Sequence, residues 1–197
     1  MGLDLDYTSG QTPLEEDEKD GLLVATITTR GELNEFEQLG VERAVEWSMK
    51  RKISINRILT EEFVKELHKR MFGNIWSWAG EFRKSNKNLG VDKNEIRVEL
   101  KKLFGDCRCW IENKMGEDEI AVRFSHRIVS IHPFANGNGR HSRLITDILV
   151  SHGLQRPQFT WGSVSLTANG AARLAYLKAL HDADGNDYRA LIEFVRE

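Results

Sequence analysis

A glycine-rich turn between two helical patterns constrains the fold of this chain more than any other feature. The turn, Gly137-Asn-Gly139, follows an apolar stripe that predicts a helix ending at His132. A second apolar stripe begins at Asn138 and stops at Gly153, which predicts a helix between them. The two stripes consist of Ala121, Phe124, Ile128 and Ile131, and of Leu144, Ile145, Ile148 and Leu149. Two helices therefore meet at a loop of only a few residues.

The start of the second helix is suited to bind an anion. Gly137 and Gly139 let the backbone turn tightly and present consecutive N–H groups, and the positive end of the helix dipole favours negative charge there. Arg140 and Arg143 lie one turn apart, so both guanidinium groups can face the same ligand. This set predicts a polyphosphate site; the simpler alternative is a glycine-rich helix cap with two solvated arginines.

His132 lies just before this turn and is the candidate base. Pro133 predicts an extended backbone at His132. Imidazole is the side chain best matched to take a hydroxyl proton near neutral pH. The alternative is a histidine that only fills the core.

The segment from His132 to Arg143 resembles the signature of the Fic (Fic/Doc) family, His-Pro-Phe-x-(Asp/Glu)-Gly-Asn-Gly-Arg-x-x-Arg. Only Asn136 departs from it. The resemblance covers residues 28–197, and Trp78-Ala-Gly-Glu-Phe-Arg83 is similar to the family's segment ahead of its flap. The pattern is closest to the small bacterial members called mobile mystery protein B, whose Thr-Arg-x-Glu-Leu-Asn-Glu opening matches Thr29 to Glu35.

The resemblance implies an all-α Fic fold, a helical bundle with a short β-hairpin flap over the active site. The flap would be residues 82–95, whose Asn, Gly and Asp content also disfavours a helix, and the alternative is an ordinary surface loop. It would pair with an extended segment of a target protein. We expect residues 28–197 to form one Fic domain, and the acidic and Gly-rich residues 1–27 to form a partly disordered N-terminal arm.

The resemblance also implies a reaction, the transfer of AMP from ATP to a Ser, Thr or Tyr hydroxyl of a target protein. His132 would be the general base. The nucleotide-binding residues would be Gly137, Asn138, Gly139, Arg140, Arg143 and Tyr176. Among them, Arg140 would hold the β-phosphate region and Arg143 the γ-phosphate.

Asn136 stands where the family usually has an Asp or Glu that binds Mg²⁺. An amide oxygen can coordinate magnesium, but it brings no negative charge. We therefore expect Asn136 to be a weak metal ligand, with Mg²⁺ held mainly through the phosphates of ATP.

Glu32 is a candidate inhibitory residue. Many relatives carry an inhibitory helix, (Ser/Thr)-x-x-x-Glu-(Gly/Asn), whose Glu pairs with the second signature arginine, and Thr28 to Leu33 matches its Thr and its Glu. The resemblance implies an ion pair between Glu32 and Arg143, with residues 28–35 as an inhibitory segment. The alternative is an acid near a helix N-terminus, which the dipole favours in any case.

Three functions compete on these observations. A protein adenylyltransferase is the leading hypothesis. A Doc-like phosphotransferase is the second, although Gly-Asn-Gly-Arg140 in place of that branch's Asn-Lys-Arg argues against it. The third is a nucleotide-binding regulatory or toxin–antitoxin partner with little catalysis, which Asn136 favours.

The composition limits the classes of partner that we expect for this chain. A net charge of −2 and a pI near 6.3 provide no basic field for nonspecific nucleic-acid binding. The chain has no apolar run of membrane-spanning length and no signal-peptide pattern, so we expect a cytoplasmic protein without a membrane partner. A helical pattern around residues 96–111 places Cys107 on its buried face and Cys109 elsewhere, as expected for two reduced thiols.

Overall fold

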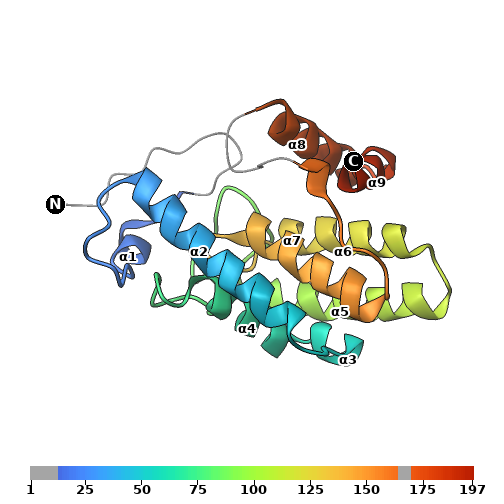
Figure 1. The fold of residues 1–197 in the computed structure, drawn as a ribbon, viewed down its shortest axis with the longest axis horizontal. Coiled ribbons are helices and arrows are strands. Elements are labelled where there is room, and N and C mark those ends of the chain that lie inside the picture. Colours follow the sequence, from blue (N-terminus) through green and yellow to red (C-terminus); the bar gives the residue numbers. More distant parts are fainter. Residues whose placement is uncertain (1–12, 164–169) are drawn as a thin grey trace.

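The computed structural model describes residues 13–163 and 170–197, which are mainly helical (Figure 1). The helices are α1 (Glu16–Lys19), α2 (Arg30–Met49), α3 (Ile55–Ile58), α4 (Glu61–Phe72), α5 (Ile96–Glu112), α6 (Glu117–Ile131), α7 (Asn138–Ile148), α8 (Ala171–Asp184) and α9 (Arg189–Arg196). A π-helical turn, η1 (Leu149–Gly153), continues α7, and a 3-10 turn, η2 (Trp161–Ser163), follows later. The predicted all-α fold is confirmed. None of these helices is both long and apolar enough to cross a membrane.

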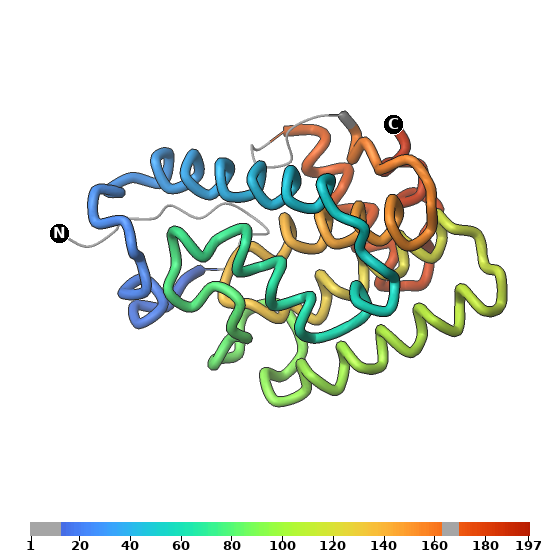
Figure 2. The backbone as a smooth tube through the Cα atoms, turned by 60° about the horizontal axis from the view of Figure 1, so that its bottom comes forward, coloured from blue at the N-terminus to red at the C-terminus, as the bar shows by residue number. Residues whose placement is uncertain are grey.

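The main core lies between α2, α4, α5, α6 and α7, which are neighbouring helices in Figure 2. Helix α4 begins at the cap of Thr60, whose hydroxyl accepts a hydrogen bond from the Phe63 amide. Helix α2 approaches α4 at Gly40, where a Cβ atom would lie 2.0 Å from the Met71 carbonyl oxygen. Only glycine allows that approach, which brings the inner face of α2 close to α4 and α7.

A smaller core joins α8 and α9 to the outer side of α6 and to η1. It contains Phe159, Trp161, Tyr176, Leu191, Phe194 and Val195, together with Ala121, Val122 and Val150. Trp161 donates its indole N–H to Asp147 on α7 at 3.0 Å. The C-terminal helices are therefore fixed to the helix that follows the glycine-rich turn.

The predicted β-hairpin at residues 82–95 is wrong for this structure. In the described chain the only β-pairing is an isolated bridge between Leu22 and Trp76, and residues 82–95 form an irregular loop. The carbonyls of Ser85 and Val91 accept from the guanidinium of Arg83. A side chain, not a ladder of backbone bonds, closes this loop.

The described part of the N-terminal arm, residues 13–27, is packed on the domain. Its Leu14 and Ile27 are buried in the main core. The Glu18 carbonyl accepts from the Trp78 indole at 2.8 Å, and its carboxylate pairs with Lys87 of the irregular loop at 2.6 Å. We predicted that the arm is partly disordered, and its residues 1–12 lie outside the described chain.

Candidate active site

The loop between α6 and α7 brings His132 next to the start of α7. His132 is the C-cap of α6 in the left-handed conformation, with φ 54° and ψ 60°. The extended backbone predicted from Pro133 is therefore wrong. The helix end favours a left-handed residue, and the His132 carbonyl accepts from Arg83 Nε at 2.7 Å, which offsets the conformational cost.

The His132 imidazole is buried and held neutral. Burial, followed by the charges of Arg83 and Lys87, lowers the pKa of His132 to about 4, although a hydrogen bond to the Val129 backbone raises it. A backbone carbonyl can only accept, so the ring nitrogen that contacts Val129 carries the hydrogen. The other nitrogen then carries no proton at neutral pH, which is the state that a general base needs.

The start of α7 presents the amides that the glycine pattern predicted. Gly137 is the N-cap with φ 78°, and a Cβ there would lie 2.6 Å from the ring of Phe72. Within the described residues no side chain caps α7, so helix geometry leaves the first-turn amides of Asn138, Gly139 and Arg140 without intrahelical acceptors. This is a backbone site for an anion.

Asn138 contributes its backbone to this site, while its side chain has a structural task. The Asn138 side chain accepts from the Phe134 amide at 2.9 Å and donates to the Phe134 carbonyl at 2.8 Å. Phe134 is fully buried. The Asn138 carboxamide thus closes the loop instead of facing a ligand.

Arg140 makes an ion pair that the sequence reasoning missed. Its Nη2 lies 2.8 Å from Oε2 of Glu37 on α2, and the other carboxylate oxygen accepts from the Trp76 indole at 2.8 Å. Glu37 is 2% exposed. The available signal was an acid on the inward stripe of α2, one turn from Leu33 and Gly40.

Arg143 lies on the other side of the α7 start, toward the smaller core. Its guanidinium carbon is 5.9 Å from the centre of the Tyr176 ring, and Gly139 is near its Nη1 because a Cβ there would lie 3.8 Å away. Burial is the first cause that lowers the pKa of Arg143, and the charge of Arg140 contributes. The two arginines are therefore close enough to repel each other. Tyr176 is a core residue beside Arg143.

Asn136 does not offer a strong metal site. Its Oδ1 accepts from the Gly137 amide at 2.6 Å, and no group of three or more His, Cys, Asp or Glu side chains in the described ranges could hold a metal ion. A neutral oxygen already engaged with its own loop fits Mg²⁺ poorly.

Glu32 lies in a capping box at the start of α2, not against Arg143. Its carboxylate accepts from the amides of Thr28 and Thr29 at 2.9 and 3.0 Å, and Thr29 accepts from the Glu32 amide in return. These bonds hold the pKa of Glu32 below its usual value. The predicted Glu32–Arg143 ion pair is therefore wrong in this structure, because the helix start already uses the carboxylate.

Arg83 is a second residue that sequence reasoning missed. Besides the His132 carbonyl it binds the carbonyls of Ser85 and Val91 and the side chain of Asn86. It therefore holds the irregular loop against His132. The loop also brings Gly90 against the histidine: a Cβ on Gly90 would lie 2.7 Å from His132 Cβ.

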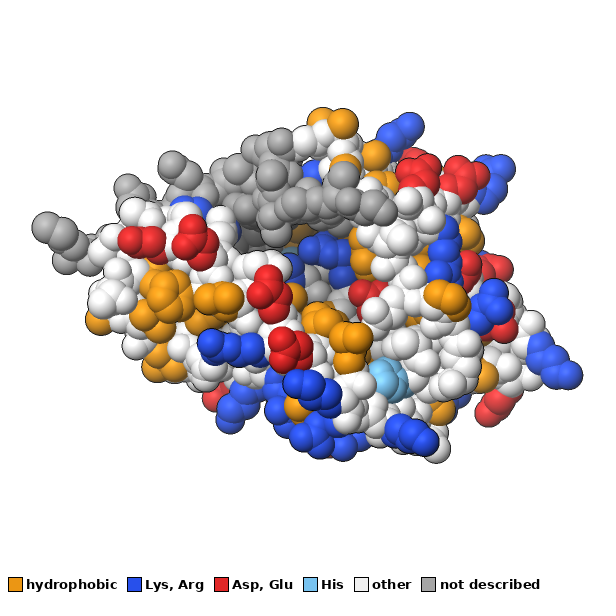
Figure 3. All heavy atoms as spheres, viewed as in Figure 1, with side chains coloured by type: hydrophobic (Ala, Val, Ile, Leu, Met, Phe, Trp, Pro, Cys, Tyr) orange, Lys and Arg blue, Asp and Glu red, His pale blue; other side chains and the backbone are white. Residues whose placement is uncertain are grey.

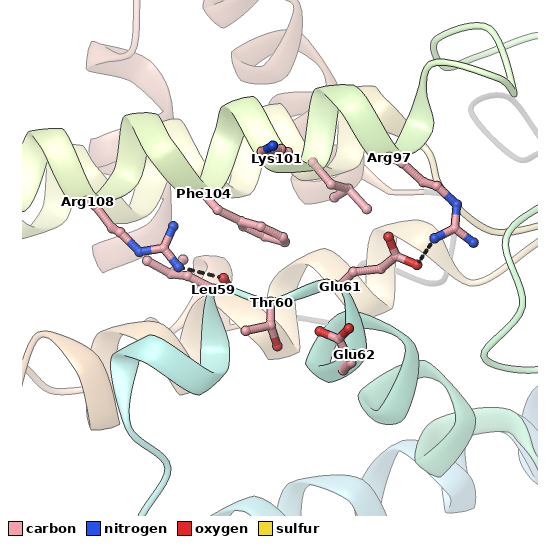
Figure 4. Close-up of a pocket in the computed structure, with 9 residues that line it drawn as sticks. Leu59, Thr60, Glu61, Glu62, Arg97, Lys101, Phe104 and Arg108 are labelled. Atoms are coloured by element: carbon pink, nitrogen blue, oxygen red, sulfur yellow. Dashed lines mark hydrogen bonds and ion pairs between the residues drawn. The ribbon is translucent and has the colours of Figure 1, made fainter.

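Figure 3 shows Lys and Arg side chains at the floor of a hollow near the middle of one face. A separate groove of about 410 Å³ lies between the start of α4 and α5 (Figure 4). Two of its cations have protein partners: Arg97 pairs with Glu61, and Arg108 donates to the Leu59 carbonyl at 2.9 Å. None of the predicted site residues lines this groove.

Comparison with known proteins supports the resemblance to the Fic family. Residues 58–150 match the sequence model of the Fic/DOC family. Protein adenylyltransferase Fic of Aedes aegypti is 25% identical over 166 residues, covering 82% of this chain and 32% of that protein. The corresponding protein of Nematostella vectensis is 25% identical over 168 residues, covering 83% of this chain and 38% of its own length. The chain thus spans about a third of the length of these relatives.

Solved structures share the fold. Fic-1 of C. elegans (residues 134–508) has a TM-score of 0.63 at 22% identity, covering 90% of this chain and 51% of that one. BepC of Bartonella tribocorum with bound AMPPNP has a TM-score of 0.67 at 17% identity, covering 92% and 97%.

Proposed function

Because residues 58–150 match the sequence model of the Fic/DOC family, we propose that the chain is a protein adenylyltransferase that moves AMP from ATP to a Ser, Thr or Tyr hydroxyl of a target protein. The observation that carries the proposal is the position of His132: a buried, neutral imidazole at the end of α6, a few residues before the uncapped amides of α7. That pairing provides a base and an anion site within one loop.

In this mechanism the target hydroxyl oxygen attacks the α-phosphorus of ATP. The new bond joins that oxygen to phosphorus, the bond to the bridging oxygen of the β-phosphate breaks, and pyrophosphate leaves. The unprotonated nitrogen of His132 takes the hydroxyl proton. The amides of Asn138, Gly139 and Arg140 stabilise the phosphate charge, and such preorganised donors supply much of the catalysis in charge-developing reactions.

The two arginines bind the outer phosphates from opposite sides of the α7 start. Arg143 faces the Tyr176 side, where burial lowers its pKa although Tyr176 and Asp147 act against that shift, so a phosphate would offset the cost of burying the cation. Arg140 is paired with Glu37, so it binds phosphate more weakly, because the phosphate must compete with the Glu37 carboxylate. Tyr176 supports Arg143 and the nucleotide from the smaller core.

Mg²⁺ would bind together with ATP. The chain supplies the neutral Asn136 and no carboxylate at that position, so the phosphates would hold the metal and no step depends on a protein-bound ion. The irregular loop 82–95, closed by Arg83 over His132, would receive the target segment.

Intact mass spectrometry of the chain and of lysate proteins after incubation with ATP and Mg²⁺ tests the proposal. We expect a mass increase of one AMP that His132→Ala abolishes. A phosphate adduct would indicate the Doc-like reaction instead. Nucleotide binding without an adduct on any protein would identify a nucleotide-binding regulatory protein, the reading that Asn136 favours.

A further inference from the structure

We propose that His68 of α4 is a positioning residue that sets the anion-binding loop by donating a hydrogen bond to the Asn136 carbonyl. The inference rests on the proposed function for its catalytic consequence, but its structural part does not. No feature of the signature itself points to His68, which lies 68 residues before Asn136.

The two contacts of the imidazole determine its tautomer. Nε2 lies 3.0 Å from the Asn136 carbonyl oxygen, and Nδ1 lies 3.0 Å from the Gly80 amide nitrogen. A carbonyl can only accept and an amide N–H can only donate. His68 therefore carries its hydrogen on Nε2, donates to Asn136, and accepts from Gly80 at Nδ1.

The surroundings keep the ring neutral and in place. His68 is 0% exposed, and its ring stacks on Phe134 with centroids 3.7 Å apart and planes at 20°. Burial is the first cause that lowers the pKa of His68 well below 6.5, and the neighbouring His141 and Arg140 act in the same direction. The donor–acceptor pattern is thus constant across the physiological range.

Fixing this carbonyl fixes the next amide. In a trans peptide the C=O of Asn136 and the N–H of Gly137 point in opposite directions. His68 holds the carbonyl on the core side, so the Gly137 amide faces the other side, where it donates to Asn136 Oδ1. The same peptide plane sets the φ of Gly137, the N-cap from which the amides of α7 follow.

The His68 bond therefore links the scaffold to the anion site. Gly80 belongs to the segment ahead of the irregular loop; its φ of 86° is rarely adopted by other residues, and a Cβ there would lie 2.9 Å from Lys69 Cβ. One ring thus connects α4, the start of that loop and the signature loop. Without the Nε2 donor, the Asn136 peptide could rotate and the first-turn amides would lose their common direction.

Two substitutions separate the two bonds. His68→Gln can reach Asn136 with its amide N–H but does not accept at the Nδ1 position, whereas His68→Asn can accept from Gly80 but does not reach Asn136. Cys107→Ser on α5, which carries none of the site residues, is a matched control for lost core stability.

We expect both His68 variants to lower the unfolding temperature, as Cys107→Ser does. Hydrogen exchange of the peptide spanning residues 133–140 should speed up about tenfold in His68→Asn and little in His68→Gln or Cys107→Ser. Affinity for a non-hydrolysable ATP analogue, measured by calorimetry, should fall about tenfold in His68→Asn and be largely retained in His68→Gln.

Equal loop exchange in the two His68 variants would overturn the inference, whatever the enzyme does. Equal nucleotide affinity in the two, despite different loop exchange, would also overturn it. A wild-type chain that forms no AMP adduct would refute the transferase proposal alone, because exchange and analogue binding still decide the role of His68.

Discussion

At the residue scale, Asn136 is the position where this chain departs from the Fic signature that its loop resembles. A carboxylate there would add one negative charge beside the phosphates, where Mg²⁺ prefers charged oxygens. We predict that Asn136→Asp lowers the Mg²⁺ concentration needed for half-maximal AMP transfer by about tenfold, equivalent to about 1.4 kcal/mol. A magnesium titration of the initial rate measures it.

The control for this prediction is Asn113→Asp at the end of α5, whose side chain bonds the Cys109 backbone and not the signature. It should leave the magnesium requirement unchanged. An unaltered requirement in Asn136→Asp would mean that this side chain does not reach the metal.

Glu37 provides a second prediction at the residue scale. Its buried carboxylate neutralises Arg140 and also accepts from Trp76. Glu37→Gln keeps the volume and one acceptor but removes the charge, so more of the positive potential of Arg140 is available to phosphate. We predict about fivefold tighter binding of the ATP analogue by calorimetry, with a loss of about 1–2 kcal/mol in the free energy of unfolding.

The matched control is Glu42→Gln, an exposed acid on the same helix that contacts Gln38. It should change neither quantity by a measurable amount. Weaker analogue binding in Glu37→Gln would show that the ion pair orients Arg140 for the nucleotide instead of competing with it.

At the scale of elements, Arg83 is the side chain that joins the irregular loop 82–95 to the signature. Arg83 is 5% exposed, and it holds two loop carbonyls as well as that of His132. We predict that Arg83→Met speeds hydrogen exchange in residues 84–93 about tenfold or more. It should also raise the pKa of His132, because the charge of Arg83 helps to lower it. An NMR titration of the imidazole measures that change.

Arg108→Met is the control for Arg83. Arg108 also donates to a backbone carbonyl, that of Leu59, but from α5 and away from the signature. Its substitution should leave both the loop exchange and the His132 titration unaltered. An unchanged loop in Arg83→Met would assign the closure to Lys87 and the acids of the arm.

At the scale of the whole molecule, buried titratable groups make stability depend on pH. Burial lowers the pKa of His132 and of His141 to about 4, below the value of 6.5 for an exposed histidine. Between these values the unfolded chain binds protons that the folded chain refuses, so acid favours unfolding. Each histidine should cost about 2 kcal/mol when the pH falls to about 5.

Asp147 acts in the opposite direction. Burial raises its pKa to about 7, so the folded chain binds the proton more tightly and gains about 2 kcal/mol over the same interval. We predict that Asp147→Asn makes the acid loss of stability steeper by about that amount, while His141→Asn makes it shallower. Urea unfolding near neutral pH and at about pH 5 measures both. The same slope in wild type and Asp147→Asn would contradict the raised pKa.

The local pattern of the sequence was sufficient for much of this molecule. Apolar periodicity predicted the helices that became α5, α6 and α7. Glycine spacing predicted an anion site at the start of α7, since tight turns and free amides are local properties of a few consecutive residues.

Only the tertiary structure decided how that site is supported. Glu37, Arg83 and His68 lie far from the signature in sequence, and each acts through a contact formed when α2, the irregular loop and α4 pack against α7 or its loop. The left-handed backbone of His132 and the engagement of Glu32 at its own helix start also follow from competing partners. The sequence by itself determined which loop holds the base and the anion site. Packing decided which distant side chains hold that loop, because periodicity shows that a residue faces inward but not what it meets there.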